Sequence, residues 1–283
     1  MGSVAFHWVT LSLSYVLLAM GMTLSLSISR IVNLAHGSFY ILGGFLFIMF
    51  LKTVGMPFGW SLLASLVVLG IVGALLEAKI YRPLGGVLAP SIICMAGVLL
   101  TIEGIVVLIF GSDLWDVPSY FTGTINLDGT VLSIERIVMA IVALLLIAGL
   151  YYFLSHVRLG KAFKATAQDR EAATLMGINV GLVSSLSMGI GAALAGLAAI
   201  QITAVYYLSP FVSYAALMTA FLVISLGGMG SILGVVVGAF IIGFVDSFGA
   251  LWVATYYHLI GFALIIIIFM VRPQGIFGVP IKD

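Results

Sequence analysis

The sequence predicts an all-α fold, a polytopic transmembrane helical bundle of about eight to nine spans. Of its 283 residues, 63% are hydrophobic and only 7% are charged, which is too little charge for the polar shell of a soluble protein of this size. Apolar runs of nearly 20 residues recur along the chain. Because these runs are continuously apolar and do not alternate, they favour membrane-spanning helices over the strands of a β-barrel.

Nine apolar segments are expected to form these helices within a single transmembrane domain over residues 1–283. They cover residues 6–28, 34–51, 60–80, 88–110, 137–156, 181–201, 211–227, 231–250 and 255–271. The first lacks preceding basic residues and a clear cleavage site, so a retained span is expected rather than a removed signal peptide. The second and seventh are short for a hydrocarbon core of about 30 Å and allow broken or re-entrant helices. Whether the 29–51 and 211–250 regions fully span therefore stays open at this point.

Small residues at four-residue spacing predict faces where helices pack closely. Gly230, Gly234 and Gly238 show this spacing, and the pairs Gly189–Ala193 and Ala192–Gly196 repeat it. Small side chains let helix backbones approach where lipid removes the usual hydrophobic driving force. We expect packing within one chain, with subunit pairing as the alternative.

The distribution of Lys and Arg predicts the orientation, because cytoplasmic loops carry an excess of them. If the loop at about 157–180 is cytoplasmic, nine of the eleven basic residues lie on that side: Arg30, Lys79, Arg82, Arg158, Lys161, Lys164, Arg170, Arg272 and Lys282. Only Lys52 and Arg136 then lie outside. The N-terminus is therefore expected outside and the C-terminus in the cytoplasm.

Composition and motifs exclude several function classes. A net charge of +1 gives no sign of nucleic-acid binding. The single Cys94 excludes an internal disulfide and any CxxC metal or redox site. Gly160-Lys161 lacks the earlier glycine of a phosphate-binding loop, and no metalloprotease or serine-hydrolase motif is found. We therefore expect no catalytic residues, cofactor or metal on this chain, and any ATP hydrolysis on partner subunits.

Charge is concentrated in one short segment. Six of the 21 charged residues lie within residues 158–171. Asp169 stands where a helix N-cap is expected, residues 170–176 have helical character, and Gly177 suits the left-handed residue after a helix end. Glu171 falls in the first turn, where a negative side chain complements the helix dipole.

This predicted helix has a small apolar face. Ala172, Leu175 and Met176 share one side, because residues three and four apart are neighbours on a helix. A plain positive-inside loop is the alternative, and basic residues alone would satisfy it. The cap at Asp169 and the Ala172-Ala173 pair fit a docking helix better.

Polar residues interrupt the apolar pattern between the first two spans: Arg30, Asn33, His36 and Gly37. One interpretation is an interfacial turn, in which Arg30 snorkels to the headgroups, Asn33 caps the next helix and His36 bonds a neighbouring carbonyl. The other is a helix break that lines a translocation path. No second histidine or carboxylate lies at ligand spacing from His36, so a metal site is not expected.

Two carboxylates fall inside predicted spans, Glu103 in the fourth and Asp246 in the eighth. Neither has an opposite charge three or four positions away. A charge at the centre of a span costs about 2.5–3.5 kcal/mol on insertion scales, so each is expected to be neutralised, paired across helices or exposed to a wet cavity. Structural pairing or cavity lining is favoured over a proton relay.

Short stretches in order along the chain resemble a known family. They are Gly21–Leu24, Arg30–Gly37, Tyr81–Leu84, Ala167–Ala173, Met176–Asn179, Leu226–Ser231 and Arg272–Gly278. Together they are similar to the branched-chain amino acid permeases of the LivH type. Glu171–Gly177 also matches the front half of the EAA loop of bacterial ABC-importer permeases, E-A-A-x-x-x-G. Ser187, Gly189 and Ile190 stand where the second half of that loop has Ile, Leu and Pro.

The resemblance implies a permease subunit of an ATP-binding-cassette importer in a bacterial inner membrane. The solute would be small, most simply a branched-chain or other hydrophobic amino acid. The implied partners are a second permease (a homologue or a second copy), two cytoplasmic ATPases and an extracytoplasmic solute-binding protein. Residues 169–177 would be the coupling helix seated in the ATPase. The N-x-A-H-G pattern of the 30–37 segment would then favour the interpretation that this segment lines the translocation path.

Two other functions remain open from the sequence alone. An importer of urea or short amides would use the same architecture. An ion-gradient-driven secondary transporter or channel is compatible with the short spans and Glu103, but the second half shows no clear repeat of the first.

Overall fold

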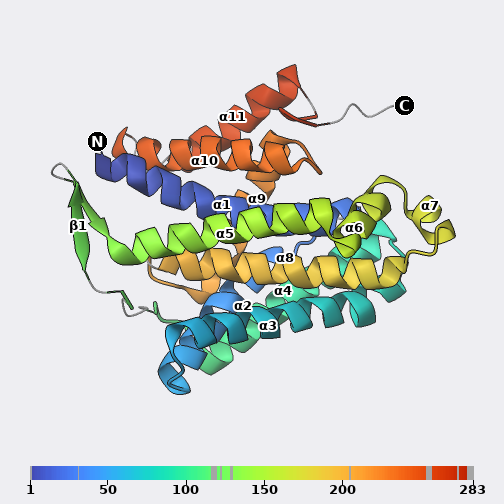
Figure 1. The fold of residues 1–283 in the computed structure, drawn as a ribbon, viewed down its shortest axis with the longest axis horizontal. Coiled ribbons are helices and arrows are strands. Elements are labelled where there is room, and N and C mark those ends of the chain that lie inside the picture. Colours follow the sequence, from blue (N-terminus) through green and yellow to red (C-terminus); the bar gives the residue numbers. More distant parts are fainter. Residues whose placement is uncertain are drawn as a thin grey trace.

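Nearly all of the described chain is helical and forms one bundle of roughly aligned helices (Figure 1). The computed structural model describes residues 2–30, 32–115, 120–121, 123–127, 130–203, 205–252, 257–272 and 274–278. Within these ranges, 8 helices are long and apolar enough to cross a membrane, and a shorter apolar helix covers Leu259–Val271. The predicted helical bundle is therefore confirmed.

The long helices follow the nine predicted segments. They are α1 (Gly2–Ser29), α2 (His36–Ile48), α3 (Phe58–Leu76), α4 (Leu88–Phe110), α5 (Ile134–His156), α8 (Val180–Thr203), α9 (Ser213–Gly227), α10 (Ile232–Trp252) and α11 (Tyr257–Val271). Short helices η1 (Met49–Thr53), η2 (Glu77–Tyr81), η3 (Arg82–Leu84) and η4 (Pro210–Val212) extend or precede them. With these extensions the second and seventh segments each reach 18 residues, His36–Thr53 and Pro210–Gly227. Both regions are thus long enough to span.

Three elements were not predicted. One is helix α6 (Arg158–Gln168), which precedes the predicted short helix, α7 (Arg170–Leu175), in the charged segment. The loop between α4 and α5 contains an antiparallel hairpin of β1 (Thr124–Leu127) and β2 (Thr130–Ser133). The dipeptide Asp128-Gly129, which lies outside the described residues, separates the strands and is one that hairpin turns favour.

Helix α8 occupies the centre of the bundle because glycines let three helices approach it (Figure 1). A Cβ added at Gly191 would lie 2.6 Å from the Gly21 carbonyl oxygen of α1, and one at Gly189 would lie 2.6 Å from the Gly70 oxygen of α3. A Cβ added at Gly196 would lie 3.1 Å from the Cα of Gly43 in α2. Larger side chains on this helix would separate the backbones, as expected for close packing in lipid.

The predicted glycine face of α10 holds at two of its three positions. A Cβ at Gly238 would lie 2.6 Å from the Val223 oxygen of α9, and Gly234 lies against the Gly227 backbone. Gly230 requires a correction: it precedes α10, and a Cβ there would meet only Ser27 Oγ, at 3.7 Å. Its φ of 87° shows that it forms the left-handed turn before the helix instead.

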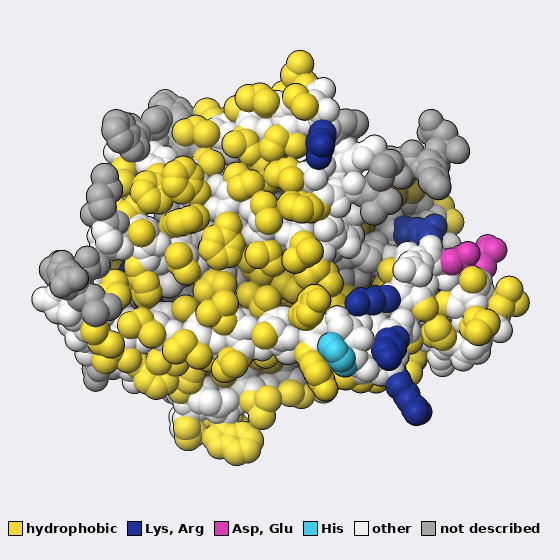
Figure 2. Space-filling view, turned by 45° about the horizontal axis from the view of Figure 1, so that its top comes forward, with side chains coloured by type: hydrophobic (Ala, Val, Ile, Leu, Met, Phe, Trp, Pro, Cys, Tyr) yellow, Lys and Arg dark blue, Asp and Glu magenta, His cyan; other side chains and the backbone are white. Residues whose placement is uncertain are grey.

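Burial separates an inner layer of helices from an outer one. In the most apolar window of each helix, 89% of α1 and 78% of α8 are buried, against 17% of α4 and α5. Figure 2 shows the resulting surface, on which hydrophobic side chains cover most of one broad face. Exposed apolar side chains such as Ile71, Leu108 and Leu145 have no protein partner to cover them in this chain, which is expected for lipid-facing helices.

The bundle has two chemically distinct ends. Helices α6 and α7 lie at one end, here called the basic end, and the N-terminus and the β1–β2 hairpin lie at the other, the hairpin end (Figure 1). Most Lys and Arg side chains visible in Figure 2 gather near the basic end. The segment after α11 also reaches this end, where the Phe277 N–H donates to the Gly227 oxygen at the end of α9.

Candidate functional site

Helix α7 is a short capped helix at the basic end. The Asp169 side chain accepts hydrogen bonds from the N–H groups of Glu171 and Ala172, at 2.9 and 3.0 Å. At the other end, Gly177 has a φ of 80°, and the N–H groups of Gly177 and Ile178 donate to the carbonyls of Thr174 and Ala173. This is a Schellman ending, which satisfies the last carbonyls of the helix. The predicted N-cap and the predicted glycine terminus are both confirmed.

The apolar side chains of α7 point away from the rest of the chain. Leu175 is 88% exposed, Met176 is 83% exposed, and Ala172 is exposed beside them. Ala173 alone faces inward and is buried. The apolar face predicted from spacing therefore exists and is uncovered. Exposed apolar side chains on a charged element outside the lipid-facing surface are typical of a docking site for another protein.

Helix α6 fixes α7 to the bundle. Gly160, Phe163 and Thr166 form its buried face, while its basic residues are exposed. Gly160 lies directly on the backbone of Phe153 at the end of α5, and the Phe163 ring packs edge-on against the Phe153 ring at 5.7 Å. The three-residue spacing of this face was a signal for a helix that the basic charge of the segment obscured.

Arg30 belongs to this end of the molecule. It closes α1 in a left-handed conformation, with a φ of 58°, and its Nη2 donates to the Gln168 carbonyl oxygen at 3.4 Å. A groove of about 700 Å³ is lined by Arg30, Asp169, Arg170, Glu171, Thr174 and Leu175. The structure thus groups Arg30 with the charged segment, at the surface, apart from the rest of the 30–37 segment.

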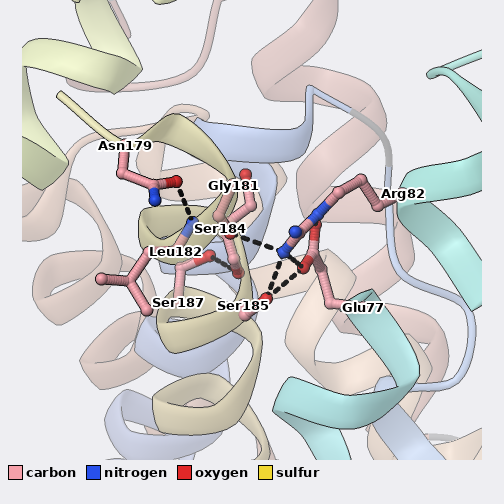
Figure 3. A network of polar contacts seen from close by, with 8 residues as sticks. All are labelled: Glu77, Arg82, Asn179, Gly181, Leu182, Ser184, Ser185 and Ser187. Carbon is pink, nitrogen blue, oxygen red and sulfur yellow. Dashed lines mark hydrogen bonds and ion pairs between the residues drawn. The ribbon is translucent and has the colours of Figure 1, made fainter. Parts of the chain in front are cut away.

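A polar network joins η2 and η3, which continue α3, to the start of α8 (Figure 3). Arg82 Nη2 forms an ion pair with Glu77 Oε2 at 2.7 Å and donates to the Gly181 carbonyl oxygen at 2.7 Å. The Ser185 hydroxyl accepts from Arg82 and donates to Glu77. Asn179 caps α8, since its Oδ1 accepts from the Leu182 N–H at 3.0 Å. The network therefore joins the end of the α3 span to the first turn of α8.

The sequence alone did not identify Glu77 and Ser185 as members of a polar network. Glu77 and Arg82 are five residues apart, which does not place them on one face of a regular α-helix. Helix η2 has the wider π-helical turn, in which residues four to five apart become neighbours. A five-residue Glu–Arg spacing at the end of a predicted span was the available signal.

Asn33 and His36 are buried inside the bundle. The Asn33 Oδ1 accepts from the Ala35 N–H at 3.0 Å, and its Nδ2 donates to Met188 Sδ at 3.1 Å. His36 Nε2 lies 2.9 Å from the Leu18 carbonyl oxygen, so this nitrogen carries the proton. His36 thus bonds a neighbouring carbonyl, as the interfacial-turn interpretation predicted. A role for this segment in a translocation path stays a prediction.

Gly37 and Glu103 both contact Ser213. The Ser213 hydroxyl at the start of α9 donates to Glu103 Oε2, and Gly37 packs directly on the Ser213 backbone. Helices α2, α4 and α9 are joined at this point. Glu103 is therefore paired across helices, which was one of the predicted fates of a carboxylate within a span.

Asp246 lines a cavity at the hairpin end. The cavity has a volume of about 580 Å³, and Asp246 Oδ2 accepts from the Tyr15 hydroxyl at 2.7 Å. Tyr206 lines the same cavity, and its hydroxyl oxygen lies 3.2 Å from His7 Nε2. Burial raises the pKa of the Tyr206 phenol above its ordinary value, so its hydroxyl stays protonated. For Asp246, the structure thus provides the lined cavity that the sequence left as an alternative.

Among the residues that the structure describes, no group of three or more His, Cys, Asp or Glu could hold a metal ion. Cys94 is a free thiol. The basic end thus carries a capped helix with an exposed apolar face, and the hairpin end carries a cavity of about 580 Å³.

Comparison with known proteins identifies relatives over nearly the whole chain. The family model described as branched-chain amino acid transport system, permease component, matches residues 4–270. The high-affinity branched-chain amino acid transport system permease protein LivH of Escherichia coli K12 is 32% identical over 97% of this chain and 94% of its own length. BraD of Pseudomonas aeruginosa, with the same description, is 32% identical over 96% and 94%.

A more distant relative is archaeal. A probable branched-chain amino acid transport permease protein LivH of Methanocaldococcus jannaschii is 28% identical over 94% of this chain and 89% of its own length. No solved structure matches the chain.

Proposed function

This chain belongs to the permease components of branched-chain amino acid transport systems, and from that premise we propose that it carries hydrophobic amino acids across a bacterial inner membrane as one half of an ATP-driven importer. A second permease, either a homologue or another copy of this chain, forms the other half. Two cytoplasmic ATPases supply the energy, and an extracytoplasmic binding protein delivers the solute. The chain itself contributes the path and the coupling, without a cofactor.

The observation that carries this proposal is the uncovered apolar face of α7. A helix capped at both ends keeps its shape without a partner, and Leu175 and Met176 are presented outward. Such a helix fits a groove on another protein, as in other helix-in-groove contacts. When the ATPases close, they move α7, and α6 and the Arg82 network transmit that motion to α5, α8 and α3.

The proposed orientation places the basic end in the cytoplasm. Eight described basic residues lie on segments of this end, whereas Lys52 and Arg136 lie towards the hairpin end. The positive-inside rule then puts the N-terminus outside and the C-terminus in the cytoplasm. The docking face of α7 meets the ATPases on this side, and the cavity beside Asp246 opens towards the binding protein.

Leucine uptake by the reconstituted complex tests the proposed function. Liposomes that contain this chain, its paired permease and the two ATPases should accumulate radiolabelled leucine only when the binding protein and ATP are both present. The expected rate is at least about tenfold above that of vesicles whose ATPases cannot hydrolyse ATP. Uptake by this chain alone, driven by an ion gradient without ATP, would instead support a secondary transporter.

Cysteine labelling tests the orientation. In a Cys94→Ala background, Lys161→Cys and Lys164→Cys should react with a membrane-impermeant maleimide only after the cells are opened. Arg136→Cys should react in intact spheroplasts. The reverse pattern would place α7 outside the cell, where no ATPase could reach it, and would refute the coupling role.

A further inference from the structure

The cavity at the hairpin end is shaped for a small amphipathic solute. Its apolar wall includes Leu11, Ile202, Leu208 and Val212, and its polar groups come from α1, α2, α8 and α10. Small-molecule sites in proteins have volumes of about 300–1,000 Å³ and are mostly apolar, with a few polar groups that fix the ligand. At about 580 Å³, this cavity falls in that range.

Asp246, the carboxylate among the residues that line the cavity, belongs to a membrane-spanning helix. Asp246 is only 8% exposed and lies on α10, inside the candidate span Ile232–Leu251. The Tyr15 hydroxyl holds one of its oxygens at 2.7 Å, which fixes the direction of the carboxylate at the cavity wall. Ionisable residues at membrane depth are costly and usually mark the path of a substrate or ion.

We propose that Asp246, positioned by Tyr15, binds the ammonium group of the transported amino acid while the apolar wall receives its side chain. The proposal rests on the function proposed above and names the part of the chain that recognises the solute. An ammonium group donates up to three hydrogen bonds and compensates the carboxylate charge in a site of low dielectric constant. Urea and short amides carry no positive charge, so this site favours amino acids over them.

A neighbouring cavity carries the opposite charge. It is lined by Arg136 and Gln201, and it shares His7 and Tyr206 with the cavity of Asp246. The contact between His7 and Tyr206 therefore lies between a carboxylate on one side and a guanidinium on the other. The neighbouring cavity has a volume of only about 10 Å³, so the cavity of Asp246 is the one with room for a solute.

Asp246→Asn in the reconstituted complex tests the proposal. Asparagine keeps the size of the side chain and an oxygen that accepts from Tyr15, but it removes the charge. We expect the amount of leucine transported per ATP hydrolysed to fall at least about tenfold, while hydrolysis stimulated by the binding protein persists. Tyr15→Phe should lower the same ratio about two- to fivefold, because it removes one hydrogen bond that positions the carboxylate and leaves the carboxylate itself in place. A purely structural role would lower uptake and hydrolysis together.

Val245→Ala is the matched control, because Val245 adjoins Asp246 on α10 but does not line the cavity. It should leave leucine transported per ATP unchanged. If Asp246→Asn fails to assemble, Tyr15→Phe decides, and wild-type coupling in that variant overturns the proposal. Wild-type coupling in Asp246→Asn also overturns it. Failure of the wild-type complex to take up leucine would refute the proposed function instead, whatever the variants do.

Discussion

Leu175→Asp is expected to abolish most leucine uptake and most of the ATP hydrolysis that transport stimulates, without harming the fold. Leu175 is 88% exposed, so the substitution removes almost no contact within this chain. In the complex, a charge would enter an apolar contact at the centre of the α7 docking face. A change at such a hot spot costs about 2 kcal/mol or more, which is roughly 30-fold in affinity. Co-purification of the ATPases and the coupled ATPase rate measure the effect.

Met229→Asp provides the control for this experiment. Met229 is also apolar, 55% exposed and close to the basic end, but it lies in the turn before α10 and outside α7. This variant should retain its ATPases and its uptake. If Leu175→Asp behaves like Met229→Asp in both assays, α7 is not the docking helix, and the coupling role proposed for Asp169–Gly177 fails with it.

Arg82→Met is expected to destabilise the chain and to uncouple ATP hydrolysis from uptake. The substitution leaves the carboxylate of Glu77, whose side chain is 9% exposed, without its cation, and it frees the Gly181 carbonyl. Breaking a fully buried ion pair costs about 3–5 kcal/mol. Because the Arg82 side chain is 40% exposed, water replaces part of the interaction, and a loss of about 1–3 kcal/mol is expected. A fall in Tm by about 3–8 °C would report it.

The double variant Glu77→Gln/Arg82→Met separates stability from coupling. Neutralising Glu77 removes the uncompensated buried charge, so thermal stability should return in part. Uptake should not return, because α3 and the start of α8 are no longer joined through Arg82. Recovery of both properties would show that the network only stabilises the protein, and that α3 takes no part in transmitting the motion of α7.

The sequence located the helices and the capped, charged segment for simple physical reasons. Lipid requires about 20 consecutive apolar residues per span. Each span can therefore be recognised from its own residues, whatever helices pack against it. Caps are equally local: Asp169 and Gly177 act on backbone groups two to five positions away, and both were predictable by position. Helix α6 was missed because the basic residues of the segment obscured the three-residue spacing of its buried face, which packs against Phe153 of the preceding helix.

Roles that depend on distant partners needed the tertiary structure. The sequence shows His36 and Glu103 as isolated polar residues, whereas the fold supplies Leu18 for one and Ser213 for the other. Gly230 is four residues before Gly234, as a glycine packing face requires. It precedes the first residue of α10, however, so the two glycines do not share a helix face.

By itself the sequence determined that this is a helical membrane protein with one capped, charged segment, because hydrophobic length and helix capping are properties of consecutive residues. Only the tertiary structure decided that Asp246 meets Tyr15 beside a cavity, and that Glu77, Arg82 and Ser185 join two helices. The contacts of Tyr15 with Asp246 and of Ser185 with Glu77 and Arg82 connect residues from about 100 to 230 positions apart in the chain. Their geometry follows from how the glycine-rich helices pack, which no local pattern encodes.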